Sequence, residues 1–175
     1  MVVKLVNPVQ SSPIMTFNRD TSQPAAGTTI QVAGFGKQGN GEFPDFLQDI
    51  TTQVVDFNTC AQSYATTMGE IPLVTDGTVF CAGDENQDAC TGDAGGGAYD
   101  ANNSTILYGL VSFGPEAGCA VPNLPGVYTD TSAFAEWIDA AVCTLSDFAP
   151  EGCTPLCVPR QSSLFWGQDK GGSTC

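Results

Sequence analysis

Short runs rich in apolar residues in the first half of the chain predict several β-strands, and apolar and polar positions alternate in residues 29–36. Such runs cover residues 2–6, 29–36, 46–56 and 78–83, and each is followed by a segment that favours turns. A period of two is typical of strands that bury one face. Residues 99–104, Tyr-Asp-Ala-Asn-Asn-Ser, have the composition of a hairpin turn. The pattern therefore indicates strands joined by tight connections.

The hydrophobic period changes near the end of this region. Five apolar residues recur at i, i+3, i+4, i+7 and i+8, as on one face of an amphipathic helix: Phe134, Trp137, Ile138, Ala141 and Val142. Ser132 is a suitable N-cap for this helix. We expect the stripe to pack into a core. A short helical turn is also expected from Cys60 to Tyr64.

Length and charge limit the functional classes. The chain has 175 residues, enough for one domain with a sizeable core. It has 5 Lys and Arg against 19 Asp and Glu, a formal charge of −14, which argues against nucleic acid and anionic membranes as partners. No apolar run approaches the roughly 20 residues that span a bilayer. Residues 1–6 do not have the pattern of a signal peptide.

Eight cysteines, an even number, indicate disulfides and an oxidising, extracellular location. Zinc is disfavoured because there are no paired Cys-x-x-Cys knuckles and no histidine. Calcium at 84–88 is disfavoured because Ala89 and Gly95 stand where an EF-hand loop needs Gly and Glu. We therefore expect no metal and no cofactor. Since disulfides without a signal peptide conflict, we expect an N-terminally truncated chain.

One glycine-rich segment carries the most specific signal. Residues 88–97 read Asp-Ala-Cys-Thr-Gly-Asp-Ala-Gly-Gly-Gly. This segment resembles the nucleophile loop of the trypsin/chymotrypsin-like serine proteases, Asp-x-Cys-x-Gly-Asp-Ser-Gly-Gly. It differs at the position of the attacking serine, where this chain has Ala94. Glycines suit a loop whose backbone must adopt positive φ or approach a ligand closely.

Other segments resemble the same family in the same order. Residues 29–36 are similar to its Val-Thr-Gly-Trp-Gly strand, 106–114 to Gly-Ile-Val-Ser-Trp-Gly, and 122–129 to Pro-Asn-x-Pro-Gly-Val-Tyr-Thr. The resemblance implies an all-β fold: the second antiparallel β-barrel of a double-barrel architecture, with the first barrel largely missing and a C-terminal α-helix. We expect a protease-like domain over 1–143 and a Cys/Pro/Gly-rich tail over 144–175.

The resemblance also implies disulfides between Cys60 and Cys81 and between Cys90 and Cys119. The remaining cysteines of the chain are Cys143, Cys153, Cys157 and Cys175. Four cysteines allow three connectivities, and the sequence does not choose among them.

Family chemistry needs a nucleophilic hydroxyl, an imidazole and an orienting carboxylate. Ala94 has no hydroxyl, the sequence contains no histidine, and the family's aspartate would precede Met1. We therefore expect no catalytic residue. By resemblance, the N–H groups of Gly92 and Ala94 correspond to the oxyanion hole. Ser112 corresponds to a residue that packs beneath the triad, so it is not expected to replace the nucleophile.

A binding site is expected to remain. By resemblance, Asp88 lies at the base of a trypsin-like specificity pocket with open walls at Gly114 and Gly126, next to Ser112. A protein or peptide with a Lys or Arg side chain is the expected partner. Asp93 corresponds to the carboxylate that pairs with a new N-terminal amine in active members. No such start is present here, so we expect a collapsed, zymogen-like loop.

The turn at 101–105 contains two overlapping N-glycosylation motifs. Asn102 and Asn103 each satisfy Asn-x-Ser/Thr. The sequence leaves open whether either is used or both are ordinary turn residues.

Three functional hypotheses follow. The first is a non-catalytic protease homologue with a binding or regulatory role. The alternative is a truncated piece of a serine endopeptidase, whose His and Asp lie upstream and whose Ser is replaced by Ala94. A third is an active protease in which Ala94 is an introduced change.

Overall fold

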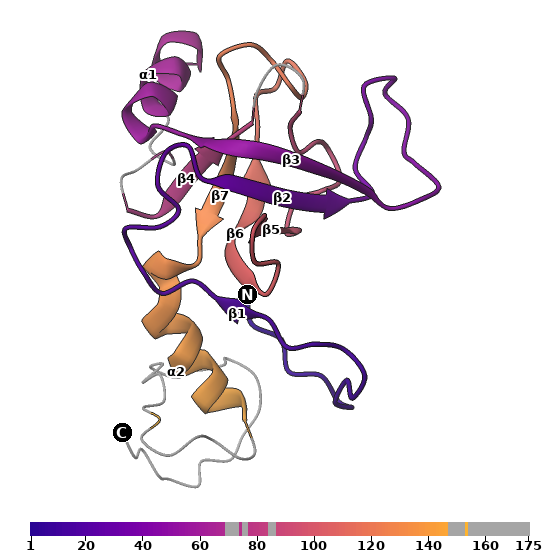
Figure 1. Cartoon of the computed structure of the whole chain (residues 1–175), viewed down its shortest axis with the longest axis vertical. Helices are drawn as coiled ribbons and strands as arrows, with labels where there is room; N and C mark the ends of the chain where they lie inside the picture. The colour runs from indigo at the N-terminus through magenta and orange to yellow at the C-terminus, as the bar shows by residue number, and fades with distance from the viewer. Residues whose placement is uncertain (69–73, 75–76, 84–86, 147–152, 154–175) are drawn as a thin grey trace, which may run out of the picture. The chain divides into compact units, whose positions relative to one another are not determined.

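Six antiparallel strands close into a barrel in the computed structural model, which describes residues 1–68, 74, 77–83, 87–146 and 153 (Figure 1). The barrel order is β6-β5-β2-β3-β4-β7, closed by pairing of β6 with β7. The short strand β1 adds to β6 in parallel. The elements are β1 Thr16–Phe17, β2 Thr29–Gly34, β3 Gln48–Val55, α1 Phe57–Met68, β4 Val79–Ala82, β5 Gly97–Asp100, β6 Ile106–Phe113, β7 Gly126–Asp130, a 3-10 turn Ser132–Phe134 and α2 Ala135–Leu145.

Two compact units are distinguished. One comprises Val9–Ala135 and holds the whole barrel with α1. The other comprises Met1–Pro8 and Glu136–Cys175, and α2 is its regular element. The expected boundary between residues 143 and 144 stays a prediction.

Alternating side chains of the strands fill the barrel. Ile30 and Val32 of β2 are almost fully buried, while their neighbours are partly exposed, as the period of two requires. The rings of Phe80 and Tyr128 stack with centroids 5.2 Å apart. A Cβ at Gly109 would lie 2.5 Å from the Phe80 ring, so this glycine makes room for the ring. The core cluster is Ile30, Val32, Val54, Phe80, Ala82, Ala98, Tyr108, Val111 and Tyr128.

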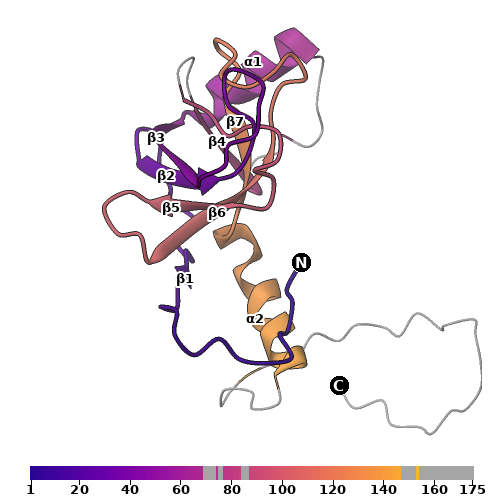
Figure 2. The same ribbon diagram turned by 90° about the vertical axis from the view of Figure 1, so that its right-hand side faces the viewer.

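A second cluster fixes α1 to the barrel. Cys60 of α1 forms a disulfide with Cys81 of β4, and both are fully buried. Tyr64, one turn later, donates a hydrogen bond to the carbonyl of Pro125 at 2.7 Å. Figure 2 shows α1 beyond the ends of β4 and β7, where these contacts hold it. The short helical turn expected here is a helix of 12 residues.

Residues 2–6 do not form the expected strand. No strand of the described chain pairs with them, and four of these five residues are exposed. An apolar run becomes a strand only where a neighbour satisfies its N–H and C=O groups. The prediction was therefore wrong for lack of a partner, and the first strand is β1.

The C-terminal helix is confirmed, but its start and burial differ from expectation. Ser132 lies inside the 3-10 turn instead of capping α2, and its N–H donates to Asp130 Oδ1 at 2.8 Å. Within the stripe, Ala141 is buried, whereas Trp137 and Val142 are 43% and 39% exposed. The stripe that was expected to pack into a core is therefore only partly buried, because an apolar period fixes a face and not what covers it.

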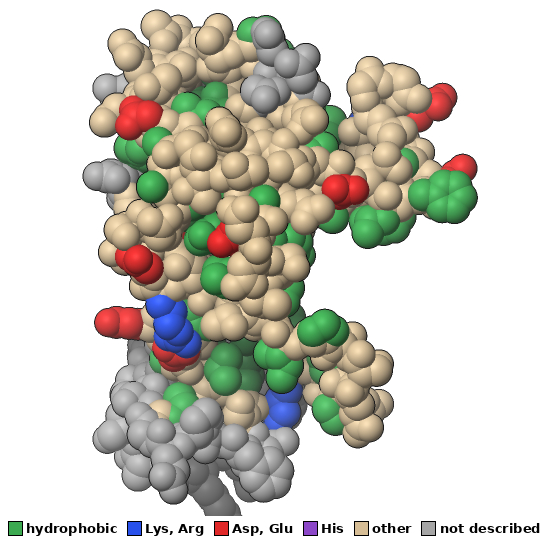
Figure 3. All heavy atoms as spheres, in the orientation of Figure 1, with side chains coloured by type: hydrophobic (Ala, Val, Ile, Leu, Met, Phe, Trp, Pro, Cys, Tyr) green, Lys and Arg blue, Asp and Glu red, His purple; other side chains and the backbone are tan. Residues whose placement is uncertain are grey.

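Surface charge is dispersed over the face that Figure 3 shows, where acidic side chains are scattered and do not form a patch. The connection between β2 and β3 stands away from the barrel in Figure 1 and exposes four large apolar side chains: Phe35, Phe43, Phe46 and Leu47. None of the described helices has the length and apolar character needed to cross a membrane.

Candidate functional site

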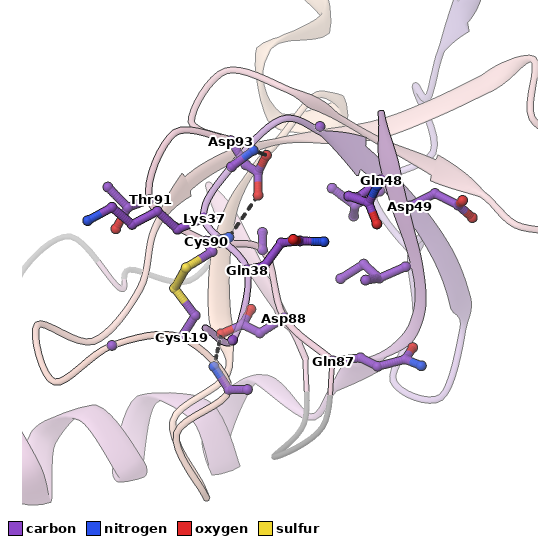
Figure 4. A pocket seen from close by; sticks show the side chains of 18 of the residues that line it. Lys37, Gln38, Gln48, Asp49, Gln87, Asp88, Cys90, Thr91, Asp93 and Cys119 are labelled. Carbon is purple, nitrogen blue, oxygen red and sulfur yellow. Dashed lines mark hydrogen bonds between the residues drawn. A yellow bond between two sulfur atoms is a disulfide. The ribbon is translucent and has the colours of Figure 1, made fainter. Parts of the chain in front are cut away.

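The glycine-rich loop between β4 and β5 borders a cavity of about 620 Å³. The end of β2, the start of β3 and the segment around Cys119 complete its lining. Asp49, Asp88 and Asp93 are among the lining residues. In Figure 4 the carboxylates of Asp88 and Asp93 point toward the hollow, whereas that of Asp49 points away from it. The cavity is therefore an acidic hollow, and Lys37 is the one basic side chain among its described lining residues.

Asp93 locks the loop onto β2. Its Oδ1 accepts a hydrogen bond from Gly36 N–H at 2.8 Å, and its Oδ2 accepts one from Cys90 N–H at 2.9 Å. A Cβ at Gly34 or Gly36 would collide with this carboxylate. Both positions therefore require glycine, because the Asp93 carboxylate lies against their Cα atoms. Each oxygen of this carboxylate accepts a hydrogen bond from a backbone N–H group.

Gly92 has a conformational and a steric reason to be glycine. Its φ is +107°, where L side chains are strained. A Cβ there would lie 3.0 Å from the Phe43 ring and 3.2 Å from Gly36 Cα. Lys37 N–H donates to the carbonyl of Thr91 at 2.9 Å, and its ammonium lies 5.7 Å from the centre of the Phe43 ring. The β2–β3 connection is therefore docked on the nucleophile-like loop.

Ala94 is exposed beside this turn. Within the described chain, neither Gly92 N–H nor Ala94 N–H has a hydrogen-bond acceptor, whereas Gly96 N–H donates to Asp93 O at 2.8 Å and Gly95 N–H to Val111 O at 2.8 Å. Two exposed amide donors can bind an oxyanion or carbonyl oxygen. The methyl group of Ala94 cannot attack a carbonyl.

Asp88 is half-buried against backbone. Its Oδ2 accepts a hydrogen bond from Ala120 N–H at 3.1 Å. A Cβ added at Gly83, where φ is +130°, would lie 3.0 Å from Asp88 Oδ1. One added at Gly126 would lie 2.5 Å from the same oxygen. The disulfide between Cys90 and Cys119 joins the two segments that carry Asp88 and Ala120. Glycine backbone and this crosslink together hold the carboxylate in place.

The sequence-based site residues are only partly brought together. Asp88 and Asp93 line the cavity, and Gly126 lies against Asp88. Ser112 and Gly114 are exposed and do not line this cavity. Asp93 is bonded to the backbone N–H groups of Gly36 and Cys90, and the collapsed, zymogen-like form of the loop stays a prediction.

The carboxylates affect two buried tyrosines nearby. Burial and the negative charge of Asp88 raise the pKa of Tyr64 to about 12. Burial, Asp88 and Asp93 raise the pKa of Tyr128 further still. Both phenols therefore stay neutral over the physiological range, so the negative potential of the hollow comes from its carboxylates.

Sequence reasoning missed three contributors: Gly36, Phe43 and Ala120. Gly36 belongs to a Gly-x-Gly pattern that signals close backbone approach. Phe43 and Ala120 carry no local signal, because their roles arise from segments that are distant in sequence.

Part of the expected chemistry falls outside the described residues. Residues 84–86 of the calcium-like segment, Cys157 and Cys175 are among these. Cys143 forms a disulfide with Cys153. Among the residues that the structure describes, no three His, Cys, Asp or Glu side chains are placed to hold a metal ion.

Known proteins are similar to this chain in sequence and in fold. The family model described as Trypsin matches residues 1–138. Human Kallikrein-5 is 36% identical over 146 residues, covering 81% of this chain and 46% of its own length. Trypsin iota of Drosophila melanogaster is 37% identical over 125 residues, covering 69% and 45%. The chain spans about half the length of the curated relatives it matches.

A solved structure adds the same result in three dimensions. Neuropsin, a serine protease expressed in mouse brain, superimposes with a TM-score of 0.60 at 28% identity, over 73% of this chain and 52% of that one. The barrel, the glycine-rich loop and these similarities all indicate the same family. The chain belongs to the trypsin family.

Proposed function

We propose that this chain is a non-catalytic member of the trypsin family that binds a basic side chain of a protein or peptide. The observation that carries the proposal is Ala94, a methyl group at the nucleophile position of a loop that otherwise keeps its glycines and its carboxylates. The substitution removes the attacking group while the backbone lock at Asp93 remains.

Loss of catalysis follows from the side chains of this chain. Acyl transfer by the family's route needs a hydroxyl at position 94 and an imidazole that accepts its proton. The first is replaced by Ala94, and the sequence contains no histidine. A histidine supplied from elsewhere would still find no hydroxyl at this position.

Retention of binding rests on Asp88. Its carboxylate is half-buried and fixed by Ala120 N–H and by the neighbouring disulfide. A fixed carboxylate beside a hollow favours a cation such as a guanidinium or an ammonium group. The net charge of −14 adds long-range attraction for basic partners. An extracellular location is part of the proposal, because disulfides persist in oxidising compartments.

A small amidinium tests this pocket directly. Benzamidine is a planar cation that imitates an arginine head group, and its binding to the purified chain can be followed by titration calorimetry. We expect measurable binding that weakens roughly tenfold or more in Asp88→Asn, because a hydrogen bond to a charged group contributes about 1.5–3 kcal/mol.

Asp49→Asn is the matched control, since Asp49 lines the same cavity but is exposed and accepts a hydrogen bond from Gln31. We expect Asp49→Asn to change affinity much less than Asp88→Asn. Equal losses of benzamidine affinity in both variants, or no binding by the unmodified chain, would contradict a specific cation-binding site at Asp88.

Peptide-bond hydrolysis is the second candidate function, which family membership favours. It requires an attacking group that position 94 does not provide. Hydrolysis of an arginyl ester distinguishes this function from binding without catalysis.

A further inference from the structure

The connection between β5 and β6 forms an exposed turn that the proposed function does not use. All five residues from 101 to 105 are exposed. Two acceptor motifs for N-linked glycosylation overlap there, Asn102-x-Ser104 and Asn103-x-Thr105. Both asparagines satisfy the motif, which ends in Ser104 for Asn102 and in Thr105 for Asn103, and the two motifs also differ in geometry.

The two motifs differ in how their hydroxyls are placed. Thr105 Oγ1 donates a hydrogen bond to Asn103 Oδ1 at 2.7 Å, and Thr105 N–H donates to the same oxygen at 3.3 Å. Asn103 Oδ1 is therefore held toward the chain. Within the described residues, Asn103 Nδ2 has no acceptor, and no comparable bond joins Ser104 to Asn102.

The backbone around Asn103 is also fixed. Asn103 N–H donates to Asp100 O at 3.1 Å, and Ile106 N–H donates to Asn103 O at 2.9 Å. Thr16 N–H donates to Thr105 O at 2.8 Å, so the neighbouring strand supports the turn from one side. The side-chain amide of Asn103 is thus presented from a defined turn, with its reactive nitrogen unengaged.

We infer that Asn103, and not Asn102, carries an N-linked glycan when the chain passes through a eukaryotic secretory pathway. The donor is a lipid-diphosphate-linked oligosaccharide. A bond forms between Asn103 Nδ2 and the anomeric carbon of the first N-acetylglucosamine, while the bond from that carbon to the diphosphate oxygen breaks. The lipid diphosphate leaves with the electron pair, and the amide nitrogen gives up one proton.

A glycan here is compatible with the candidate site. The glycine-rich loop enters β5 at Gly97, and the turn begins after Asp100 at the other end of that strand. Strand geometry, about 3.3 Å per residue, places roughly 10 Å between these two points. The glycan would therefore be attached at the end of β5 that lies away from the glycine-rich loop. It would also prevent a second glycan on adjacent Asn102 by crowding.

The experiment maps occupancy on the secreted full chain. The protein is expressed with a cleavable leader in a eukaryotic cell. Its glycans are then removed by an amidase in water enriched in heavy oxygen. This reaction converts each glycosylated Asn to an Asp that carries the heavy oxygen label. Cleavage after Tyr99 and Tyr108 isolates the peptide 100–108. Its fragmentation spectrum assigns the label. We expect label at residue 103; an unlabelled residue 103, or label at residue 102 instead, would overturn the inference.

Two single substitutions provide matched controls. Ser104→Ala destroys the motif of Asn102 alone, and we expect it to retain the label at residue 103. Thr105→Ala destroys the motif of Asn103 alone, and we expect loss of that label. Thr105→Ser keeps a hydroxyl and should restore it. Label at residue 103 that persists in Thr105→Ala would contradict the assigned role of Thr105.

Discussion

Asp93 Oδ1 accepts a hydrogen bond from Gly36 N–H at 2.8 Å, across 57 positions of sequence. This contact joins the segment that follows β2 to the loop in which the nucleophile would stand. Together with Cys90 N–H on Oδ2, it satisfies the carboxylate with backbone donors. The loop therefore keeps its conformation through contacts that do not involve residue 94. This is why alanine at that position leaves the glycine-rich loop intact.

The tight fit of Gly36 against Asp93 predicts a large effect of a single methyl group. Gly36→Ala would place a Cβ into the carboxylate, and overpacking of this kind costs about 1–3 kcal/mol. We expect a corresponding fall in the free energy of unfolding, measured by denaturant titration. Gly39→Ala is the control, because a Cβ there meets nothing within 4 Å. Equal stability of the two variants would show that the contact between Gly36 and the Asp93 carboxylate is less tightly packed than described.

Alkaline pH should weaken the fold through Tyr64. Burial and Asp88 raise its folded pKa to about 12 from the model-compound value of 10.0. The unfolded chain therefore loses this proton first, so the contribution is complete below pH 10 and is lost as pH rises toward 12.

In Tyr64→Phe, we expect a shallower loss of stability between these pH values, together with a cost of about 1 kcal/mol at neutral pH from the lost bond to Pro125 O. The measurement is the free energy of unfolding as a function of pH. An unchanged slope in the variant would refute the assigned pKa.

The two barrel disulfides should have separable effects. Cys60 and Cys81 are 21 residues apart, and Cys90 and Cys119 are 29 apart. Replacing either pair by alanine should lower stability by about 2–4 kcal/mol.

Only the pair at Cys90 and Cys119 adjoins Asp88 and Ala120, so only its removal should also weaken benzamidine binding under conditions where the protein remains folded. Calorimetric titration of both variants checks this. Equal loss of binding in both would mean that Asp88 is not positioned by the nearby crosslink.

Local pattern predicted the strands that have partners in the barrel. Residues 29–34 alternate and bury one face, residues 79–82 are apolar and largely buried, and both strands pair on both sides. Residues 2–6 are also rich in apolar residues but remain outside any strand, because local composition does not identify a pairing neighbour. The cap expected at Ser132 failed for a similar reason, since Asp130 supplies the acceptor instead.

The candidate site was predictable as a set of residues but not as an arrangement. The glycine-rich motif identified Asp88, Asp93 and Ala94. It did not predict that Gly36 would hold Asp93 or that Phe43 would cover Gly92. These contacts depend on how the β2–β3 connection folds back, which local sequence does not determine.

The most direct test of the central claim is hydrolysis of an arginyl ester by the purified chain, measured beside Asp88→Asn. We predict no turnover above the buffer rate in either protein, because position 94 has no attacking group. Turnover by the unmodified chain that Asp88→Asn abolishes would contradict the account, since it would place an active acyl-transfer centre at this pocket.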